Sequence, residues 1–101
     1  MLRISQDKRD AEGAVLLIEG DLVGDAVGTL AEEAGPLAAS GARLFLDLGG
    51  VRTLDAAGLL LLRQWSGRLT LLRPSGYVAL LLRQYGLEGC VEGGEGTSPR
   101  E

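Results

Sequence analysis

Short apolar segments of strand length alternate along this chain with segments of helical periodicity. Residues 2–6 (LRISQ) alternate apolar and polar side chains, which is the period of a half-buried strand. Residues 14–19 (AVLLIE) form an almost continuous apolar run, and the polar segment 7–13 between them ends in glycine and predicts a turn. The chain is therefore predicted to open with an antiparallel hairpin.

Two further strands are predicted at 43–48 and 68–72, and Cys90-Val91 could add a short one. Because strands that alternate with helices need crossover connections, the sheet should be mostly parallel, and the opening hairpin makes it mixed. The predicted fold class is α/β, with about four to five strands and about three to four helices. Helices are predicted from a cap at Asp25 to a stop at Gly41, from Ala56 to about Ser66, and from Tyr77 to Tyr85, with a kink or break of the first at Gly35-Pro36.

The length and composition are those of one globular domain. The chain has 101 residues, of which 46% are hydrophobic and 24% charged, an ordinary globular composition. We expect the domain to cover residues 1–92. Residues 93–101 (GGEGTSPRE) have almost nothing to bury, so they should form a flexible C-terminal tail.

Charge and apolar run length exclude some partners. The net charge is −4 and the basic residues are scattered, which argues against nucleic acid, whose binding depends on neutralised phosphates. No apolar run approaches the roughly 18 residues that span a bilayer, so no direct membrane insertion is expected. One cysteine and no visible signal peptide favour a cytoplasmic protein.

The absence of histidine argues against an enzyme. It removes the commonest general base and, together with the presence of only one cysteine, argues against a structural zinc site. No metal or cofactor is expected. Asp47 and Asp55 bracket residues 49–54, but a strand end and a helix cap account for them without catalysis, and Gly49-Gly50 lacks the lysine and glycine spacing of a phosphate-binding loop.

The most informative segment is the start of the second predicted helix. The strand 43–48 leads into a loop, which ends at Asp55 and the small residues Ala56, Ala57 and Gly58. Such a helix start has free backbone N–H groups, and its small side chains allow another surface to approach closely. The simpler interpretation is that Asp55 is a cap and the alanines are good helix formers.

This segment resembles the STAS domain, the fold of bacterial anti-sigma factor antagonists. The resemblance rests on Leu46-Asp47-Leu48 followed by residues 54–59 (LDAAGL), and on residues 19–22 (EGDL) at the preceding turn. It covers about residues 1–92 in the right element order and implies a STAS-type fold. In regulatory members, the residue after the aspartate is a Ser or Thr that a cognate anti-sigma factor kinase phosphorylates, which breaks the docking.

The chain departs from that pattern at the phosphoacceptor-equivalent position, which is Ala56 and is not phosphorylatable. Thr53 is the nearest hydroxyl and could be a substitute acceptor, although a loop or solvated threonine is the simpler interpretation. The resemblance therefore implies a protein partner, either an anti-sigma factor kinase that is bound without the usual switch or a subunit of a lipid-transport or sensory assembly. A homodimer is left open, and a small-ligand sensor for a nucleotide or lipid, with a pocket at residues 49–54, is the alternative from another class.

Helix geometry indicates which side of the second helix docks. At about 100° per residue, Gly58, Leu59, Leu62, Trp65 and Ser66 share the side assigned to the sheet. Ala56, Ala57, Leu60, Arg63 and Gln64 fall on the other side. The third helix repeats the sequence LLRQ followed by an aromatic residue, and it should bury Val78, Leu81, Leu82 and Tyr85 and leave Leu80 outward. One exposed leucine is normal, but beside two alanines it could anchor a partner. The predicted partner-binding residues are Thr53, Asp55, Ala56, Ala57, Leu60, Arg63 and Gln64.

Overall fold

The computed structural model of the protein describes residues 2–10 and 13–92. This part contains strands β1 (Leu2–Asp10), β2 (Gly13–Leu22), β3 (Leu44–Leu54) and β4 (Leu69–Leu72). It also contains helices α1 (Asp25–Ala39), α2 (Ala56–Gln64) and α3 (Gly76–Gln84), and the 3₁₀ turns η1 (Ser66–Arg68) and η2 (Glu88–Cys90).

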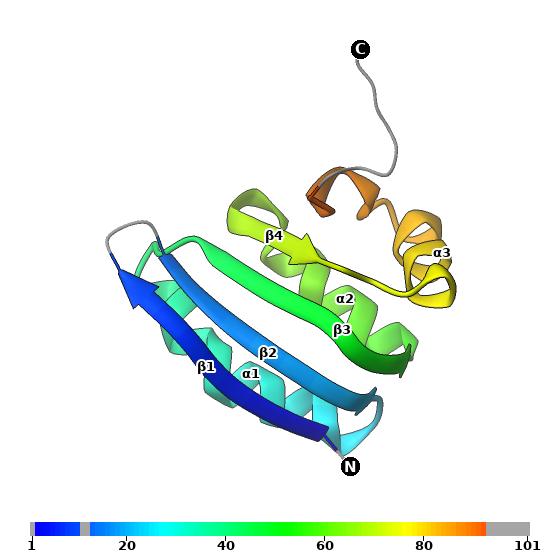
Figure 1. Cartoon of the computed structure of the whole chain (residues 1–101), viewed down its shortest axis with the longest axis horizontal. Helices are drawn as coiled ribbons and strands as arrows, with labels where there is room; N and C mark the ends of the chain where they lie inside the picture. The colour runs from blue at the N-terminus through cyan, green and yellow to red at the C-terminus, as the bar shows by residue number, and fades with distance from the viewer. Residues whose placement is uncertain (1, 11–12, 93–101) are drawn as a thin grey trace.

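The strands form one sheet in the order β1-β2-β3-β4. β1 pairs antiparallel with β2, whereas β2 with β3 and β3 with β4 are parallel. In Figure 1 the sheet faces the viewer, α1 and α2 lie behind it, and α3 lies beyond the end of β4, where it packs against β3. The predicted α/β class, with a mixed and mostly parallel sheet, is confirmed.

The core lies between the sheet and the helices. In β3, Leu44, Leu46 and Leu48 are buried, while Phe45 and Asp47 between them are half-buried on the other face. This alternation follows from the two-residue period of a strand. The helices complete the core with fully or almost fully buried side chains, namely Leu30, Leu59, Leu62, Val78 and Leu82.

β3 is longer than the sequence indicates. A loop was expected from Gly49-Gly50 onward, and this is wrong, because β3 continues to Leu54 and remains paired with β2 as far as Leu22. Gly50 pairs with Glu19 where the register between the strands shifts, and a Cβ on Gly50 would lie 2.8 Å from Glu19 Cγ. Glycine here permits a close approach of two strands rather than a turn.

α1 is continuous, so the predicted break at Pro36 is also wrong. A proline inside a helix costs about 3 kcal/mol, but Leu30 and Ala34 before it and Ala38 after it are all buried against the core. Packing on both sides of Pro36 therefore holds the helix together. α1 is also not capped by Asp25, because its N-cap is Gly24, with no side-chain hydrogen bond.

The third helix and most of the second follow the prediction. α2 ends at Gln64, slightly before the expected end, and Ser66 is exposed in η1 rather than facing the sheet. Val91 forms a parallel bridge with Leu71, where a short strand was expected.

The domain boundary at 92 stays a prediction, and the predicted tail over 93–101 lies outside the described residues. None of the helices in the described segments has the length and hydropathy needed to cross a bilayer.

Candidate functional site

Asp55 joins the start of α2 to the turn that follows β2. Its Oδ1 accepts a hydrogen bond from the Gly58 backbone N–H at 2.9 Å, which makes it the N-cap of α2. Its Oδ2 accepts from the Gly24 backbone N–H, also at 2.9 Å, and its own N–H donates to the Leu22 carbonyl oxygen at 3.3 Å. The cap predicted from sequence is confirmed, and the same side chain also ties the first turn of α2 to the first turn of α1.

Gly58 allows the start of α2 to pack closely against the end of β2. A Cβ on Gly58 would lie 2.8 Å from the Leu22 carbonyl oxygen and 3.3 Å from Leu22 Cγ. Real Cβ atoms essentially never approach another atom so closely, so a larger residue at this position would push α2 away from the end of β2. The small residues at the start of α2 therefore have two separate roles: Gly58 faces inward, and Ala56 and Ala57 are exposed.

The hydrogen bonds at Asp55 favour its charged form. The backbone N–H groups of Gly24 and then Gly58 lower the pKa of Asp55 below its ordinary value. Both carboxylate oxygens are engaged within the chain, so the structure assigns Asp55 the role of positioning α2. A contact between Asp55 and a partner stays a prediction.

The side of α2 opposite the core is accessible along its whole length. Ala56, Ala57, Arg63 and Gln64 are exposed, and Leu60 retains 51% of its maximal exposure. We refer to these five residues as the α2 outer side. The helical assignment made from sequence places every one of them correctly, although their role in binding is not tested by their position.

Thr53 differs from the α2 outer side because it lies in β3, is half-buried, and pairs in register with Asp21. Arg52 beside it donates to both carboxylate oxygens of Asp21, from Nε at 3.1 Å and Nη2 at 2.9 Å. Sequence reasoning missed this ion pair, because its members are far apart in the chain. The one available signal was opposite charge at the ends of two predicted neighbouring strands.

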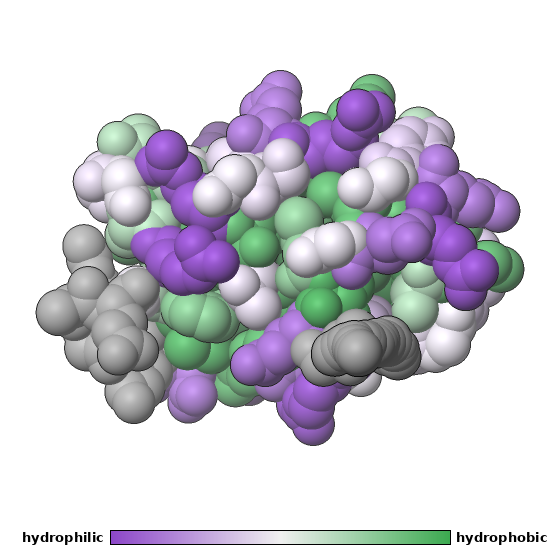
Figure 2. Space-filling view, turned by 90° about the horizontal axis from the view of Figure 1, so that it is seen from above, coloured by the Kyte–Doolittle hydropathy of each residue, from purple (hydrophilic) through white to green (hydrophobic). Residues whose placement is uncertain are grey.

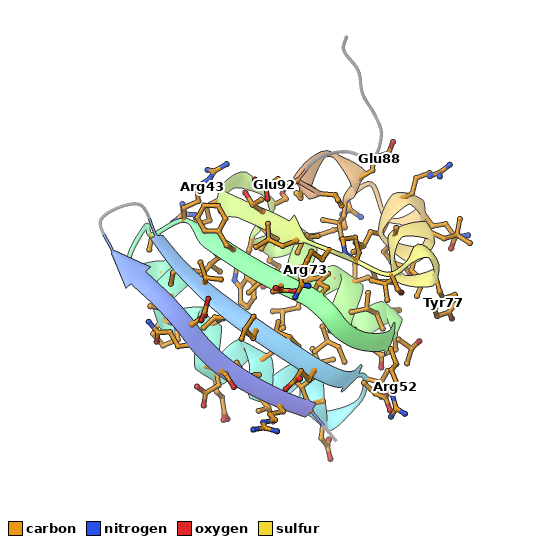
Figure 3. The ribbon with its side chains drawn as sticks, in the orientation of Figure 1. Arg43, Arg52, Arg73, Tyr77, Glu88 and Glu92 are labelled. Atoms are coloured by element: carbon orange, nitrogen blue, oxygen red, sulfur yellow. The ribbon has the colours of Figure 1, made fainter. Side chains whose placement is uncertain are left out.

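Asp47 is on the open face of the sheet and pairs with Arg73, as the position of Arg73 in front of β3 in Figure 3 illustrates. Arg73 donates to Asp47 Oδ2 from Nη2 at 2.8 Å and from Nε at 3.1 Å. Partial burial alone would raise the pKa of Asp47, but the hydrogen bonds from Arg73 and from the Gly49 N–H lower it below its ordinary value. Asp47 and Asp55 therefore have separate partners and do not form a carboxylate pair.

Two cavities are described, and Gln64 is the one residue of the α2 outer side that lines either of them. One of about 150 Å³ lies beside the Asp47–Arg73 pair and is lined by only one residue of the segment 49–54, Gly50. A shallow groove of about 410 Å³ lies between α1 and the end of α2, with Trp65 and Arg68 among its lining residues. Within residues 2–10 and 13–92, no group of three His, Cys, Asp or Glu side chains is placed to hold a metal ion.

Comparison with known families identifies the fold. Residues 5–92 match the family model described as "Mlab, STAS domain". The chain belongs to the STAS domain family. No curated protein matches this STAS chain significantly.

Two solved structures of SpoIIAA share the architecture of this STAS domain. The unphosphorylated form of this anti-sigma factor antagonist aligns with a TM-score of 0.71 and 20% identity, over 88% of this chain and 85% of that one. SpoIIAA described as the Bacillus cell fate determinant, in its phosphorylated form, aligns with a TM-score of 0.68 and 18% identity, over 88% of each chain. At these identities the similarity establishes the fold.

Proposed function

We propose that this STAS domain is a non-enzymatic regulatory module that docks a protein partner through the α2 outer side. The observation that supports this most directly is Leu60, a large apolar side chain that is half exposed between Ala56, Ala57 and Arg63. Rigid support from Asp55 and Gly58 fixes this surface relative to the sheet. The similarity to an anti-sigma factor antagonist favours an anti-sigma factor kinase as the partner, in the cytoplasm.

We further propose that this docking is not switched by phosphorylation in the usual way. Ala56 occupies the exposed first position of α2, directly after the Asp55 cap, and it has no hydroxyl. Alanine resembles an unphosphorylated serine in size and charge, so the surface would be able to bind a partner at all times. Incubation with the partner kinase and ATP tests this, since phosphate on Thr53 together with loss of binding would contradict it.

A second candidate is a subunit of a larger assembly, such as a lipid-transport or sensory complex. The description of the matching family model, "Mlab, STAS domain", names no anti-sigma factor antagonist, so it does not favour the kinase over an assembly. Both candidates use a protein partner and the same surface. The identity of the partner recovered with the wild-type chain decides between them.

The test is a pull-down from extract of the source cell with wild-type protein and two variants. Leu60→Asp should abolish recovery of the partner, because it places a charge at the centre of the apolar contact. Ala56→Asp should do the same, because it places negative charge where a phosphoryl group would lie. Both positions are exposed, so circular dichroism should show that both variants remain folded.

Thr29→Asp is the control, because Thr29 is an exposed residue of α1 and receives the same new charge. It should recover as much partner as the wild type. Equal recovery with Leu60→Asp and Ala56→Asp would place the interface elsewhere on the molecule.

A further inference from the structure

The described part of the chain exposes three large apolar side chains, and all of them are on α2 and α3. They are Leu60, Tyr77 and Leu80, which are 51%, 57% and 47% exposed. Figure 2 views the molecule from above Figure 1, the side on which α3 lies, and shows apolar areas separated by hydrophilic side chains. Because these exposed apolar side chains are confined to two helices rather than spread over the surface, the two helices are the candidates for a binding surface.

The two helices present the same pattern outward. Each is nine residues long, begins at a side-chain cap that accepts from the N–H three residues on, and ends in Arg-Gln before an aromatic residue. Leu60 and Arg63 of α2 thus correspond to Leu80 and Arg83 of α3, and all four are exposed. Both helices pack against β3, and Arg52 and Tyr77 in Figure 3 lie at the same end of the molecule, where β3 ends.

The segment from the start of α2 to the residue before η2, between Asp55 and Glu88, has charged side chains of one sign. Residues 56–87 contain four arginines and no Asp or Glu, although the whole chain has a net charge of −4. Arg68 donates to the Ala38 carbonyl oxygen and Arg73 is paired with Asp47. Within the described ranges, neither Arg63 nor Arg83 has an ion-pair partner.

We propose that the docking surface continues from α2 onto α3, and that its occupant is an acidic protein surface. The apolar contacts are Leu60, Tyr77 and Leu80, and Arg63 and Arg83 select carboxylates on the partner. This proposal rests on the proposed function and adds the chemistry of the partner. Complementary charge of this kind raises the rate of association and excludes partners of the wrong sign.

An acidic protein fits these observations better than an anionic membrane. Binding to lipid headgroups usually requires a cluster of four or more basic residues beside an apolar face, whereas each helix here has one outward arginine. A protein surface needs only a few carboxylates placed opposite Arg63 and Arg83.

The test measures the affinity of the purified partner, recovered in the pull-down and re-expressed, for the wild-type chain and for charge-reversal variants. Arg63→Glu and Arg83→Glu together should weaken binding by about tenfold or more, because like charges would then face each other. Wild-type affinity should also fall as salt rises from about 50 to about 500 mM. Arg43→Glu is the matched control and should change affinity by less than about twofold, since Arg43 is exposed at the opposite end of the molecule from Tyr77 (Figure 3).

Other results would overturn the proposal in distinguishable ways. If Leu60→Asp abolishes binding while the arginine variants bind normally, the docking site stands and the acidic partner is wrong. If all three substitutions leave affinity unchanged, the proposed function fails as well. Two further outcomes require that the arginine variants leave the affinity for the purified partner unchanged. If the arginines are then needed for co-sedimentation with phosphatidylglycerol vesicles, the surface binds a membrane. If they are needed for self-association in sedimentation velocity, the surface binds a second copy of the chain.

Discussion

The residues around Asp55 show how a short motif fixes the relative position of two helices. One carboxylate oxygen caps α2 through Gly58, and the other holds Gly24, the N-cap of α1. The Gly24 backbone has φ of 57° and ψ of −129°, a conformation that glycine adopts most readily. The cap was predictable from the sequence because its partner is three residues away, whereas the bond to Gly24 was not, because 31 residues separate the two.

The lowered pKa of Asp55 predicts a pH-dependent effect of Asp55→Asn. A carboxyl group with a lowered pKa stabilises the folded state above its pKa in the unfolded chain, near 4, and this stability is lost as pH falls through the lower folded pKa. Asparagine keeps one acceptor for the two N–H groups. The variant should therefore be less stable than wild type near pH 7, and the difference should shrink toward about pH 3.

Urea unfolding of both proteins across this pH range measures the difference. Glu33→Gln, which removes the same charge from an exposed position of α1, should show no such convergence. If the free energies of unfolding of wild type and Asp55→Asn differ by the same amount at every pH, the charge of Asp55 does not contribute to holding α2 against α1.

At the scale of elements, a helix or strand could be predicted where the spacing of apolar residues within its own segment determines its structure. The inward and outward sides of α2 and α3 follow from helical periodicity alone, and the structure confirms them, apart from Ser66. Two of the errors occurred at Gly49-Gly50 and Pro36, where contacts from other parts of the chain override the local preference. Partners far away in the sequence are invisible to a pattern within one segment.

Two glycines that look alike in the sequence should respond oppositely to alanine. Gly28 lies inside α1 with no atom near its missing Cβ, so Gly28→Ala should stabilise the protein by about 0.5–1 kcal/mol. Gly58→Ala should destabilise it by about 1–3 kcal/mol, because the new methyl group would collide with the Leu22 carbonyl. Thermal and urea unfolding measure both changes, and a stabilised Gly58→Ala variant would show that α2 does not lie so close to β2.

At the scale of the whole molecule, the alternation of strands and helices was enough to predict a mixed, mostly parallel sheet. Because β2 and β3 are parallel neighbours, their C-terminal ends lie side by side. The helices that follow them, α1 and α2, therefore begin at the same end of the sheet. The exposed side of α2, where we propose that a partner docks, could be predicted from sequence because it lies within one helix. Tyr77 was missed, although its spacing of three residues from Leu80 places the two side chains on the same side of α3.

The central claim is that the outward sides of α2 and α3 meet a protein partner, and amide hydrogen exchange of the purified complex tests it most directly. Exchange is measured for the free and bound chain, because contact with a partner slows the opening of the helices beneath it. Slower exchange in residues 56–64 and 76–84 of the bound chain, with β1 unchanged, is the result the structure predicts. Slower exchange in β1 and β2 alone, with both helices unchanged, would contradict it.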